Sequence, residues 1–340
     1  MKKEVSFLIS GILIGALVAT CGFALFLRRP KNVSVGGNAQ VVLKLGHSLD
    51  VSHPVHKAME FMNERLVELS GGTVEIDIYP SSVLGSEVQC IEQLQNGSLD
   101  MTKTSAASVE NFLPEMAVFG LPYLFRDEVH YWNVLSGEIG KELLEAMQAK
   151  GLRGLCYYDS GSRNFYTKDH PIRTPDDLKG LKIRVMNSRT AMDMVSTLGA
   201  APTPIAWGEL YTALAQGAVD GAENNPPSFT TNKHYEICKH FSKDAHTMIP
   251  DVLMISTKTW QKLDPQVQKW VQQAADESSV FQRKLWKEKT IQSLEEAKAA
   301  GVTIHEVDKS LFAEKVKPMY DAIENEKIKD LVARIRKVKP

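Results

Sequence analysis

Three short segments of the sequence carry side chains suited to binding an organic anion. Arg184 lies within the apolar residues 181–185, where burying an unpaired charge is costly. Side chains alternate along a strand, so Lys182 and Arg184 are expected on the same side of it. A guanidinium group matches a carboxylate through two parallel hydrogen bonds, which makes Arg184 the first candidate for binding a carboxylate. From composition alone, the commoner role of such a residue is a structural ion pair with an Asp or Glu.

The other two segments are polar ends of expected strands. Arg163 follows a strand, in a turn over residues 159–164, and loops at strand ends are where α/β proteins bind ligands. Asn224 lies in the polar residues 223–227, and its amide both donates and accepts hydrogen bonds. Trp207 is a candidate wall of a sugar site, because apolar sugar faces pack on indole rings. The alternatives are a solvated arginine, a plain turn and ordinary core packing, respectively.

Motifs for covalent or metal chemistry are missing from the sequence. It contains no Gly-x-Ser-x-Gly elbow, phosphate-binding loop, dinucleotide-binding motif or His-Glu-x-x-His. Asp50, His53 and His56 have a spacing that metal ligands sometimes show, but Pro54 favours a helix start there. We therefore predict solvated or capping histidines at these positions, no metal site, no cofactor and a binding protein rather than an enzyme.

Segments with strand and helix patterns alternate along the chain, which predicts an α/β fold with a largely parallel sheet. The expected strands cover residues 41–45, 74–79, 99–104, 154–158, 181–185 and 219–222, and the expected helices cover residues 56–69, 87–95, 174–178, 188–198 and 208–216. A helical stretch from residue 265 to about residue 300 would extend roughly 50 Å, too long for one small domain. We expect it to run across two domains.

Composition places the chain among folded globular proteins. Its 340 residues include 40 Lys and Arg, 41 Asp and Glu, and 43% hydrophobic residues, with a net charge of −1. This length suggests two domains, and the balanced charge argues against nucleic acid as a partner. The cysteines at positions 90, 156 and 238 are predicted to be small buried thiols.

The N-terminus has the pattern of an export segment. Lys2 and Lys3 precede an uncharged stretch over residues 5–27, long enough to cross a bilayer. Three outcomes are open: an uncleaved signal anchor, a lipid on Cys21, or cleavage of a signal peptide near Ala39. Each places the remaining chain outside the cytoplasm, so we predict a periplasmic protein, tethered to the inner membrane by residues 5–27 or by a lipid on Cys21.

Ordered motifs at matching spacings make the chain resemble TRAP-type periplasmic solute-binding proteins, the DctP family. The motifs are residues 79–85, 93–100, 119–123, 178–185, 199–204 and 218–224, and the resemblance runs from about residue 43 to residue 317. It implies a periplasmic-binding-protein fold, in which two α/β domains enclose a cleft and share a long C-terminal helix. After the export segment 1–40, the domains are expected over 41–162 plus 251–285 and over 163–250 plus 286–335.

The same resemblance implies transport of an organic acid. The protein would capture the acid and deliver it to the small and large membrane subunits of a TRAP permease, using an ion gradient. A ligand-sensing subunit of a signalling receptor and an exported enzyme acting on a carboxylated sugar are the alternatives.

Site residues follow from the resemblance position by position. Arg184 falls on the arginine that forms a salt bridge with the ligand carboxylate, Arg163 on a second ligand-contacting arginine and Asn224 on a contacting asparagine. The positions that vary with the ligand are Ser48, Glu87, Ser105 and Trp207. Ser105 stands where sialic-acid binders carry Glu, which argues against sialic acid. A hexuronate is the favoured ligand, with Glu87, Asn224 and His47 as partners for its hydroxyls, and a C4-dicarboxylate is the alternative.

Overall fold

A computed structural model describes residues 40–339 of the protein. The apolar segment 5–27, Cys21 and the cleavage position near Ala39 lie outside the described residues, so the expected anchor, lipid and signal peptide stay predictions. In the described part of the chain, no helix is both long enough and apolar enough to cross a membrane.

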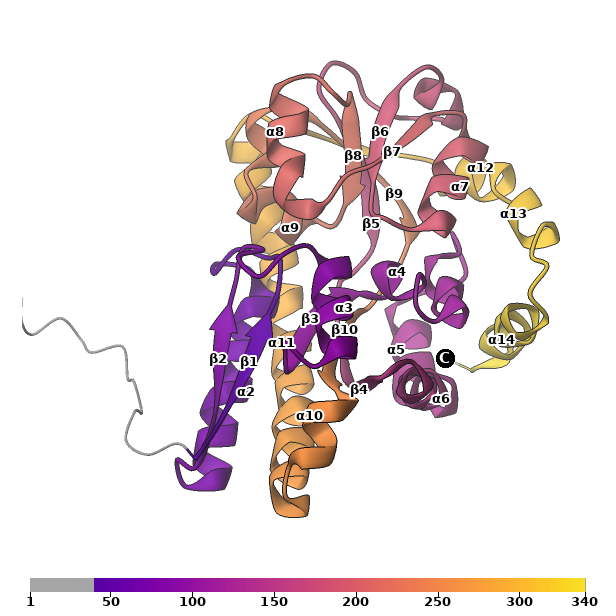
Figure 1. Ribbon diagram of the computed structural model, residues 1–340. Coiled ribbons are helices and arrows are strands. Elements are labelled where there is room, and N and C mark those ends of the chain that lie inside the picture. Colours follow the sequence, from indigo (N-terminus) through magenta and orange to yellow (C-terminus); the bar gives the residue numbers. More distant parts are fainter. Residues whose placement is uncertain (1–39, 340) are drawn as a thin grey trace, which may run out of the picture. The chain divides into compact units, whose positions relative to one another are not determined.

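Five strands form the first sheet, which defines the five-stranded lobe (Figure 1). In spatial order they are β2 (Val74–Tyr79), β1 (Val41–Gly46), β3 (Met101–Ser105), β10 (Asp251–Ser256) and β4 (Leu152–Tyr158). Strand β1 runs parallel to β2 and β3, whereas β10 runs antiparallel to both β3 and β4.

Six strands form the second sheet, which defines the six-stranded lobe. In spatial order they are β11 (Thr303–Glu306), β9 (His240–Thr247), β5 (Arg163–Thr167), β8 (Gly221–Asn224), β6 (Lys182–Val185) and β7 (Ala201–Pro204). Strand β6 runs parallel to β7 and β8, and β5 runs antiparallel to β8 and β9.

Both sheets are therefore mixed, and the expectation of a largely parallel sheet needs correction at β5 and β10. Parallel neighbours need a crossover connection, usually a helix. Neither β5 nor β10 follows a helix, because the chain enters each of them from the other sheet through the short links 159–162 and 248–250. Each of these strands consequently runs against its neighbours.

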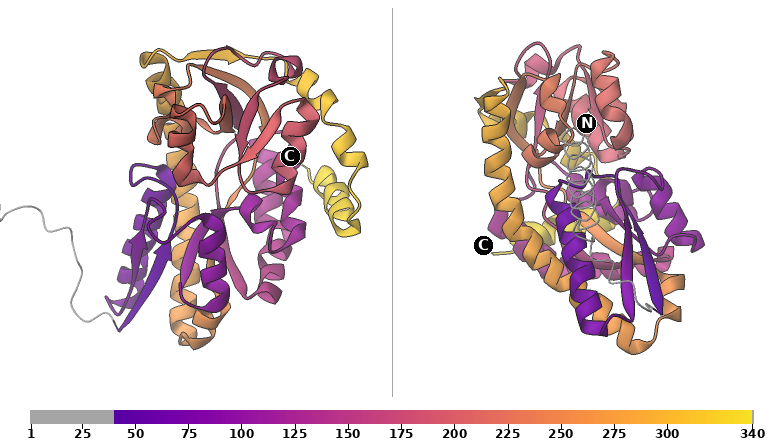
Figure 2. Two further views of the ribbon diagram at one scale, coloured as in Figure 1. Left: turned by 45° about the horizontal axis from the view of Figure 1, so that its top comes forward. Right: turned by 90° about the vertical axis from the view of Figure 1, so that its left-hand side faces the viewer.

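Helices cover the faces of both sheets (Figure 2). The α-helices are α2 (Pro54–Ser70), α3 (Glu87–Asn96), α4 (Ala106–Val109), α5 (Glu128–Ser136), α6 (Glu138–Ala146), α7 (Arg189–Leu198), α8 (Leu210–Ala215), α9 (Pro226–Thr231), α10 (Thr257–Lys262), α11 (Pro265–Ala299), α12 (Lys309–Lys315), α13 (Pro318–Asp321) and α14 (Glu326–Lys337). Short 3-10 helices occupy η1 (Pro114–Gly120), η2 (Met147–Lys150), η3 (Pro175–Leu178), η4 (Trp207–Glu209) and η5 (His234–Glu236). The spacing that predicted α2 places Met59, Met62 and Leu66 in the core.

Helix α11 confirms the expected long helix shared by the two lobes (Figure 1). It packs against α2 and β4 of the five-stranded lobe and against α9 and β11 of the six-stranded lobe. Gln282 fixes it to the link between β4 and β5, because its amide nitrogen donates to the Asp159 carbonyl at 2.8 Å and its oxygen accepts from the Asp159 N–H at 2.7 Å. The final helix, α14, packs against η1 and α6 of the five-stranded lobe.

The three described cysteines are free and buried, which confirms the expectation of buried thiols. Burial raises the pKa of Cys90 to about 11 and that of Cys238 to about 12. These thiols fill core space and stay protonated near neutral pH.

Candidate functional site

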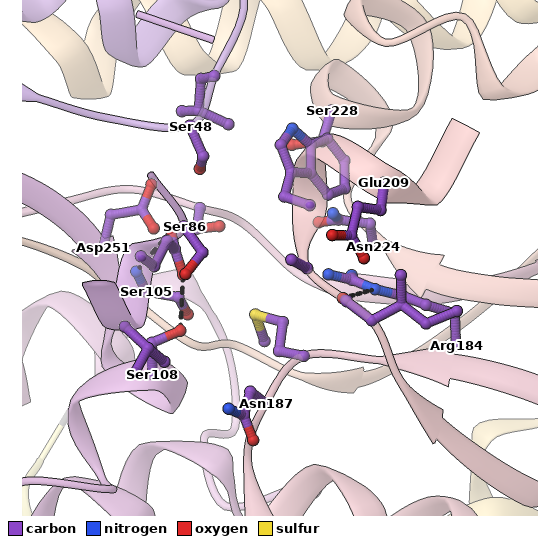
Figure 3. Close-up of a pocket in the computed structure, with 18 of the residues that line it drawn as sticks. Ser48, Ser86, Ser105, Ser108, Arg184, Asn187, Glu209, Asn224, Ser228 and Asp251 are labelled. Atoms are coloured by element: carbon purple, nitrogen blue, oxygen red, sulfur yellow. Dashed lines mark hydrogen bonds between the residues drawn. The ribbon is translucent and has the colours of Figure 1, made fainter. Parts of the chain in front are cut away.

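A cavity of about 460 Å³ lies between the two lobes and is lined by residues of both. Figure 3 shows Ser48, Ser86 and Asp251 on one side, facing Arg184 and Asn224 on the other. Its volume is within the roughly 300–1,000 Å³ of small-molecule sites in proteins. The strand directions explain why polar groups meet here. Strands β6 and β8 end at this edge of their sheet, and β5, running the opposite way, begins there with Arg163.

Arg184 is a buried cation without a carboxylate partner among residues 40–339. Its side chain is 2% exposed, and its Nε donates to the Ile205 carbonyl oxygen at 2.9 Å. Its Nη1 is buried and has no hydrogen-bond partner within the described part of the chain. Burial lowers the pKa of this guanidinium. The geometry leaves Arg184 uncompensated at the wall of the cavity, unlike the structural ion pair that composition alone favours.

Arg163 is buried in an ion pair, although the sequence places it in a turn. It is the first residue of β5 and is 3% exposed. Its Nε lies 2.5 Å from Glu223 Oε2, its Nη2 donates to Glu223 Oε1 at 2.9 Å and to the Glu223 carbonyl, and its Nη1 donates to Asn224 Oδ1 at 2.9 Å. These contacts use all but one of the five N–H groups of the guanidinium.

The ion pair continues into a buried chain of charges that sequence reasoning missed. His246 Nε2 lies 3.2 Å from Glu223 Oε2, and His246 Nδ1 lies 2.7 Å from Asp244 Oδ2. Burial opposes the charged imidazolium, but the two carboxylates outweigh it and raise the pKa of His246 to about 9. Burial likewise opposes the Glu223 carboxylate, but Arg163 and His246 lower its pKa to about 2. His246 and Glu223 therefore stay charged near neutral pH.

Asn224 is held in one orientation by its neighbours. Its Oδ1 accepts from Arg163 Nη1 and from the Asn225 N–H, each at 2.9 Å. The amide nitrogen of Asn224 is thus left as a donor at the cavity wall. Asn225 caps α9 by accepting from the Ser228 N–H at 2.9 Å.

The wall on the five-stranded side holds a buried lysine between two carboxylates, which we call the Lys103 cluster: Lys103, Asp251 and Glu87. Lys103 Nζ lies 3.0 Å from Asp251 Oδ2 and 3.7 Å from Glu87 Oε1. Burial raises the pKa of Asp251, although the charge of Lys103 opposes this. Sequence reasoning missed Lys103 and Asp251. For Asp251 the available signal was the one used for Arg184, a charge at the edge of an apolar strand, whereas the polar strand around Lys103 gives no such signal.

Seven of the eight predicted site residues line this cavity. They are Ser48, Glu87, Ser105, Arg163, Arg184, Trp207 and Asn224. Trp207 adds a buried Nε1 that has no hydrogen-bond partner in the described part of the chain, and its ring centroid lies 5.6 Å from Arg184 Cζ.

His47 does not line the cavity. It is 2% exposed, its Nε2 lies 3.0 Å from His56 Nδ1, and its Nδ1 accepts from the Leu49 N–H. Burial, with a contribution from the charge of Lys103, lowers the pKa of His47 to about 2, so it is neutral. His53 does line the cavity, and it caps α2 as predicted, but it is buried rather than solvated.

His53 also joins the two lobes. Its Nδ1 accepts from the Val55 N–H at 3.2 Å, so the neutral ring carries its proton on Nε2. Nε2 lies 3.1 Å from Ser228 Oγ, on α9 of the other lobe. Within residues 40–339, no group of three or more His, Cys, Asp or Glu side chains is placed to hold a metal ion.

The family model, the solved structures and the curated relative described here are all extracellular or periplasmic solute-binding proteins. The family model described as bacterial extracellular solute-binding protein, family 7, matches residues 45–327. A TRAP periplasmic solute-binding protein from Bradyrhizobium sp. BTAi1, solved with α/β-D-galacturonate, is 42% identical with a TM-score of 0.84, over 86% of this chain and 99% of that chain. Another, from Xanthobacter autotrophicus Py2 with bound β-D-galacturonate, is 39% identical with a TM-score of 0.85, over 87% of this chain and 100% of that chain. The C4-dicarboxylate-binding periplasmic protein DctP of Rhodobacter capsulatus is 31% identical over 314 residues, 91% of this chain and 92% of that protein.

Proposed function

Because the chain belongs to the bacterial extracellular solute-binding protein family 7, a family of binding proteins rather than enzymes, we propose that its ligand is a hexuronate such as D-galacturonate or D-glucuronate. The ligand would be captured outside the cytoplasm and passed to the small and large membrane subunits of a TRAP permease. Arg184, Asn224 and Trp207 would bind the carboxylate end of the sugar acid.

One observation carries this proposal: the uncompensated charge of Arg184 at the cavity wall. A buried cation without a counter-ion is costly, and a ligand carboxylate supplies the missing partner. Guanidinium and carboxylate form two parallel, charge-assisted hydrogen bonds, which fix the orientation of the ligand as well as its charge. The donors at Asn224 and Trp207 lie on the same side of the cavity.

Capture would follow from ligand contacts with both lobes. A ligand that touches Arg184 on one lobe and the Lys103 cluster on the other binds the closed arrangement better than an open one. It shifts the population toward the closed form only by that difference in affinity.

A C4-dicarboxylate is the second candidate, favoured by the similarity to the Rhodobacter capsulatus protein. Three cationic residues line the cavity, and two of them, Arg163 and Arg184, would each take one carboxylate; the third is Lys103. The pairing of Arg163 with Glu223 weighs against it, because most of that guanidinium is already satisfied.

A thermal-shift screen, followed by calorimetry, tests the ligand class. A ligand that binds only the folded protein raises its melting temperature. We expect D-galacturonate or D-glucuronate to give a clear rise, and succinate and L-malate to give little. A rise with dicarboxylates alone would refute the hexuronate proposal, and conversion of a uronate during incubation would favour an enzyme.

The tether is tested separately by cell fractionation. We propose that residues 5–27, or a lipid on Cys21, keep the protein at the outer face of the inner membrane. Membrane attachment that is lost in Cys21→Ser supports the lipid, and attachment that persists in this variant supports the anchor.

A further inference from the structure

The two walls of the cavity differ in the hydrogen-bonding groups that they leave unpaired. On the six-stranded side, the unpartnered groups of Arg184 and Trp207 and the amide nitrogen of Asn224 are donors, although the Glu209 carboxylate also lines this side. On the five-stranded side, the Lys103 cluster carries two carboxylates and one ammonium group, so it has one excess negative charge. Figure 3 shows Asp251, Ser105 and Ser108 on this side, away from Arg184.

The side chains of the Lys103 cluster are buried or partly buried and held in place by the fold, and some of their donor and acceptor groups remain available to a ligand. Lys103 is 2% exposed, and only one of the three N–H groups of its ammonium donates a hydrogen bond, to Asp251. Asp251 is 6% exposed, and only its Oδ2 takes part in a hydrogen bond within the described part of the chain. Glu87 is held in place by the Ser108 hydroxyl at 2.7 Å and by the Ser105 N–H at 3.2 Å.

We propose that the Lys103 cluster selects solutes whose far end carries hydroxyl groups and rejects solutes with a second carboxylate there. A hydroxyl donates and accepts at once, so a hydroxyl can donate to Asp251 while a neighbouring hydroxyl accepts from Lys103. A carboxylate only accepts, and it would bring a third negative charge to one ammonium group. The like charges make that arrangement unfavourable, which gives specificity by repulsion.

The inference rests on the proposed function and narrows it. The expected ligands are uronates, which carry one carboxylate and a hydroxyl-bearing ring. C4-dicarboxylates and sugar acids oxidised at both ends are expected to bind more weakly. Asp251 is the specificity-determining residue that we single out, because it is the first residue of β10 and lies opposite Ser105, the last residue of β3.

Galactarate is a suitable probe, because it has the carbon skeleton of galacturonate with C1 oxidised to a second carboxylate. This oxidation also opens the ring, so the effect of charge is measured by the change in preference between the wild-type protein and a variant. Calorimetry would give the ratio of the two dissociation constants for the wild-type protein and for Asp251→Asn, which keeps the shape and removes one negative charge. We expect the wild-type protein to prefer galacturonate at least tenfold, and the variant to reduce this preference at least tenfold. Glu87→Gln removes the other carboxylate and repeats the test if Asp251→Asn does not fold.

Glu209→Gln is the matched comparison, because Glu209 lines the same cavity on the side of Arg184. We expect it to change the ratio less than twofold. A folded Asp251→Asn or Glu87→Gln protein that does not gain galactarate relative to galacturonate overturns the inference, as does an equal gain in Glu209→Gln or a wild-type protein that binds both acids equally. A wild-type protein that binds no uronate would instead overturn the proposed function.

Discussion

Substitutions of Arg184 distinguish its effect on the stability of the ligand-free protein from its contribution to ligand affinity. Arg184→Met keeps much of the apolar stem and removes the charge, and Arg184→Lys keeps the charge and removes the planar pair of donors. A hydrogen bond to a charged group contributes about 1.5–3 kcal/mol, so losing two of them weakens binding by about 3–6 kcal/mol. At about 1.4 kcal/mol for each factor of ten, Arg184→Met should weaken hexuronate binding by roughly 10²- to 10⁴-fold. Arg184→Lys, which loses one of the two bonds, should weaken it by roughly 10- to 100-fold.

The stability of the ligand-free protein should change in the opposite direction. Arg184→Met loses the hydrogen bond from Nε to the Ile205 carbonyl, which contributes about 1 kcal/mol. It also removes a buried cation that has no carboxylate partner in residues 40–339, and the effective burial penalty of an ion is several kcal/mol. We therefore expect the ligand-free variant to melt at or above the temperature of the wild-type protein.

Calorimetry with the bound hexuronate and thermal melts without it check both expectations on the same samples. Asp276→Asn serves as the control, since this residue lies on α11 and does not line the cavity. Binding of wild-type strength in Arg184→Met would refute the carboxylate clamp. A large loss of affinity together with a large fall in melting temperature would show that Arg184 holds the fold together instead.

Three further predictions concern pH, the contact between the lobes and the thiols. The pKa of His246 is about 9 in the folded protein, against 6.5 in the unfolded chain, so the charged imidazolium stabilises the fold. This stabilisation, about 3 kcal/mol, is complete below pH 6.5 and is lost as the pH rises through 9. The lowered pKa of His47 makes stability fall at acid pH instead. Below pH 6.5 the imidazole of His47 is protonated in the unfolded chain but stays neutral in the folded protein, which favours unfolding. Urea unfolding across this range should show maximum stability near pH 6.5, and His246→Gln should remove the decline at alkaline pH; a decline that persists in the variant would contradict the assignment. Ser228→Ala removes the hydrogen bond from His53 between the lobes, so calorimetry should show ligand binding roughly two- to tenfold weaker, and an unchanged affinity would mean that this contact does not stabilise closure. Mass spectrometry after alkylation of the native protein should find Cys90, Cys156 and Cys238 unmodified, and the same thiols should react once the chain is unfolded. Rapid labelling of any of them in the native protein would contradict their burial.

Local patterns in the sequence were sufficient for the elements that build the frame of the site. The alternation at residues 74–79 gives β2, and the apolar spacing after His53 gives α2, because burial of one face leaves a clear period in the sequence. The length of α11 was also readable, since no Gly or Pro interrupts residues 266–299. Seven of the eight predicted site residues line the cavity, although only Arg184 and Asn224 among them lie within the quoted family motifs.

Strand direction was the property that local patterns did not contain. Arg163 reads as a turn residue because it follows Gly161, but it begins a strand whose partners lie about 60 to 80 residues further along the chain. His47 reads as a strand-end residue facing a ligand, but its ring turns to His56 instead. The position of Arg163 depends on pairing with distant segments, and that of His47 on a side-chain contact with a neighbouring helix. Periodicity and turn signals reveal neither.

The reversed strands β5 and β10 perform the same task in the two sheets. Each begins at the edge where its antiparallel neighbours end, and each begins with a charged residue, Arg163 in β5 and Asp251 in β10. A parallel sheet alone offers only its strand ends and loops to a ligand. The reversal adds a side chain anchored in the sheet itself, which is held more rigidly than one on a loop. In the six-stranded lobe this anchor is neutralised by Glu223, so that Arg184 in β6 keeps the unpaired charge that the ligand carboxylate would complete.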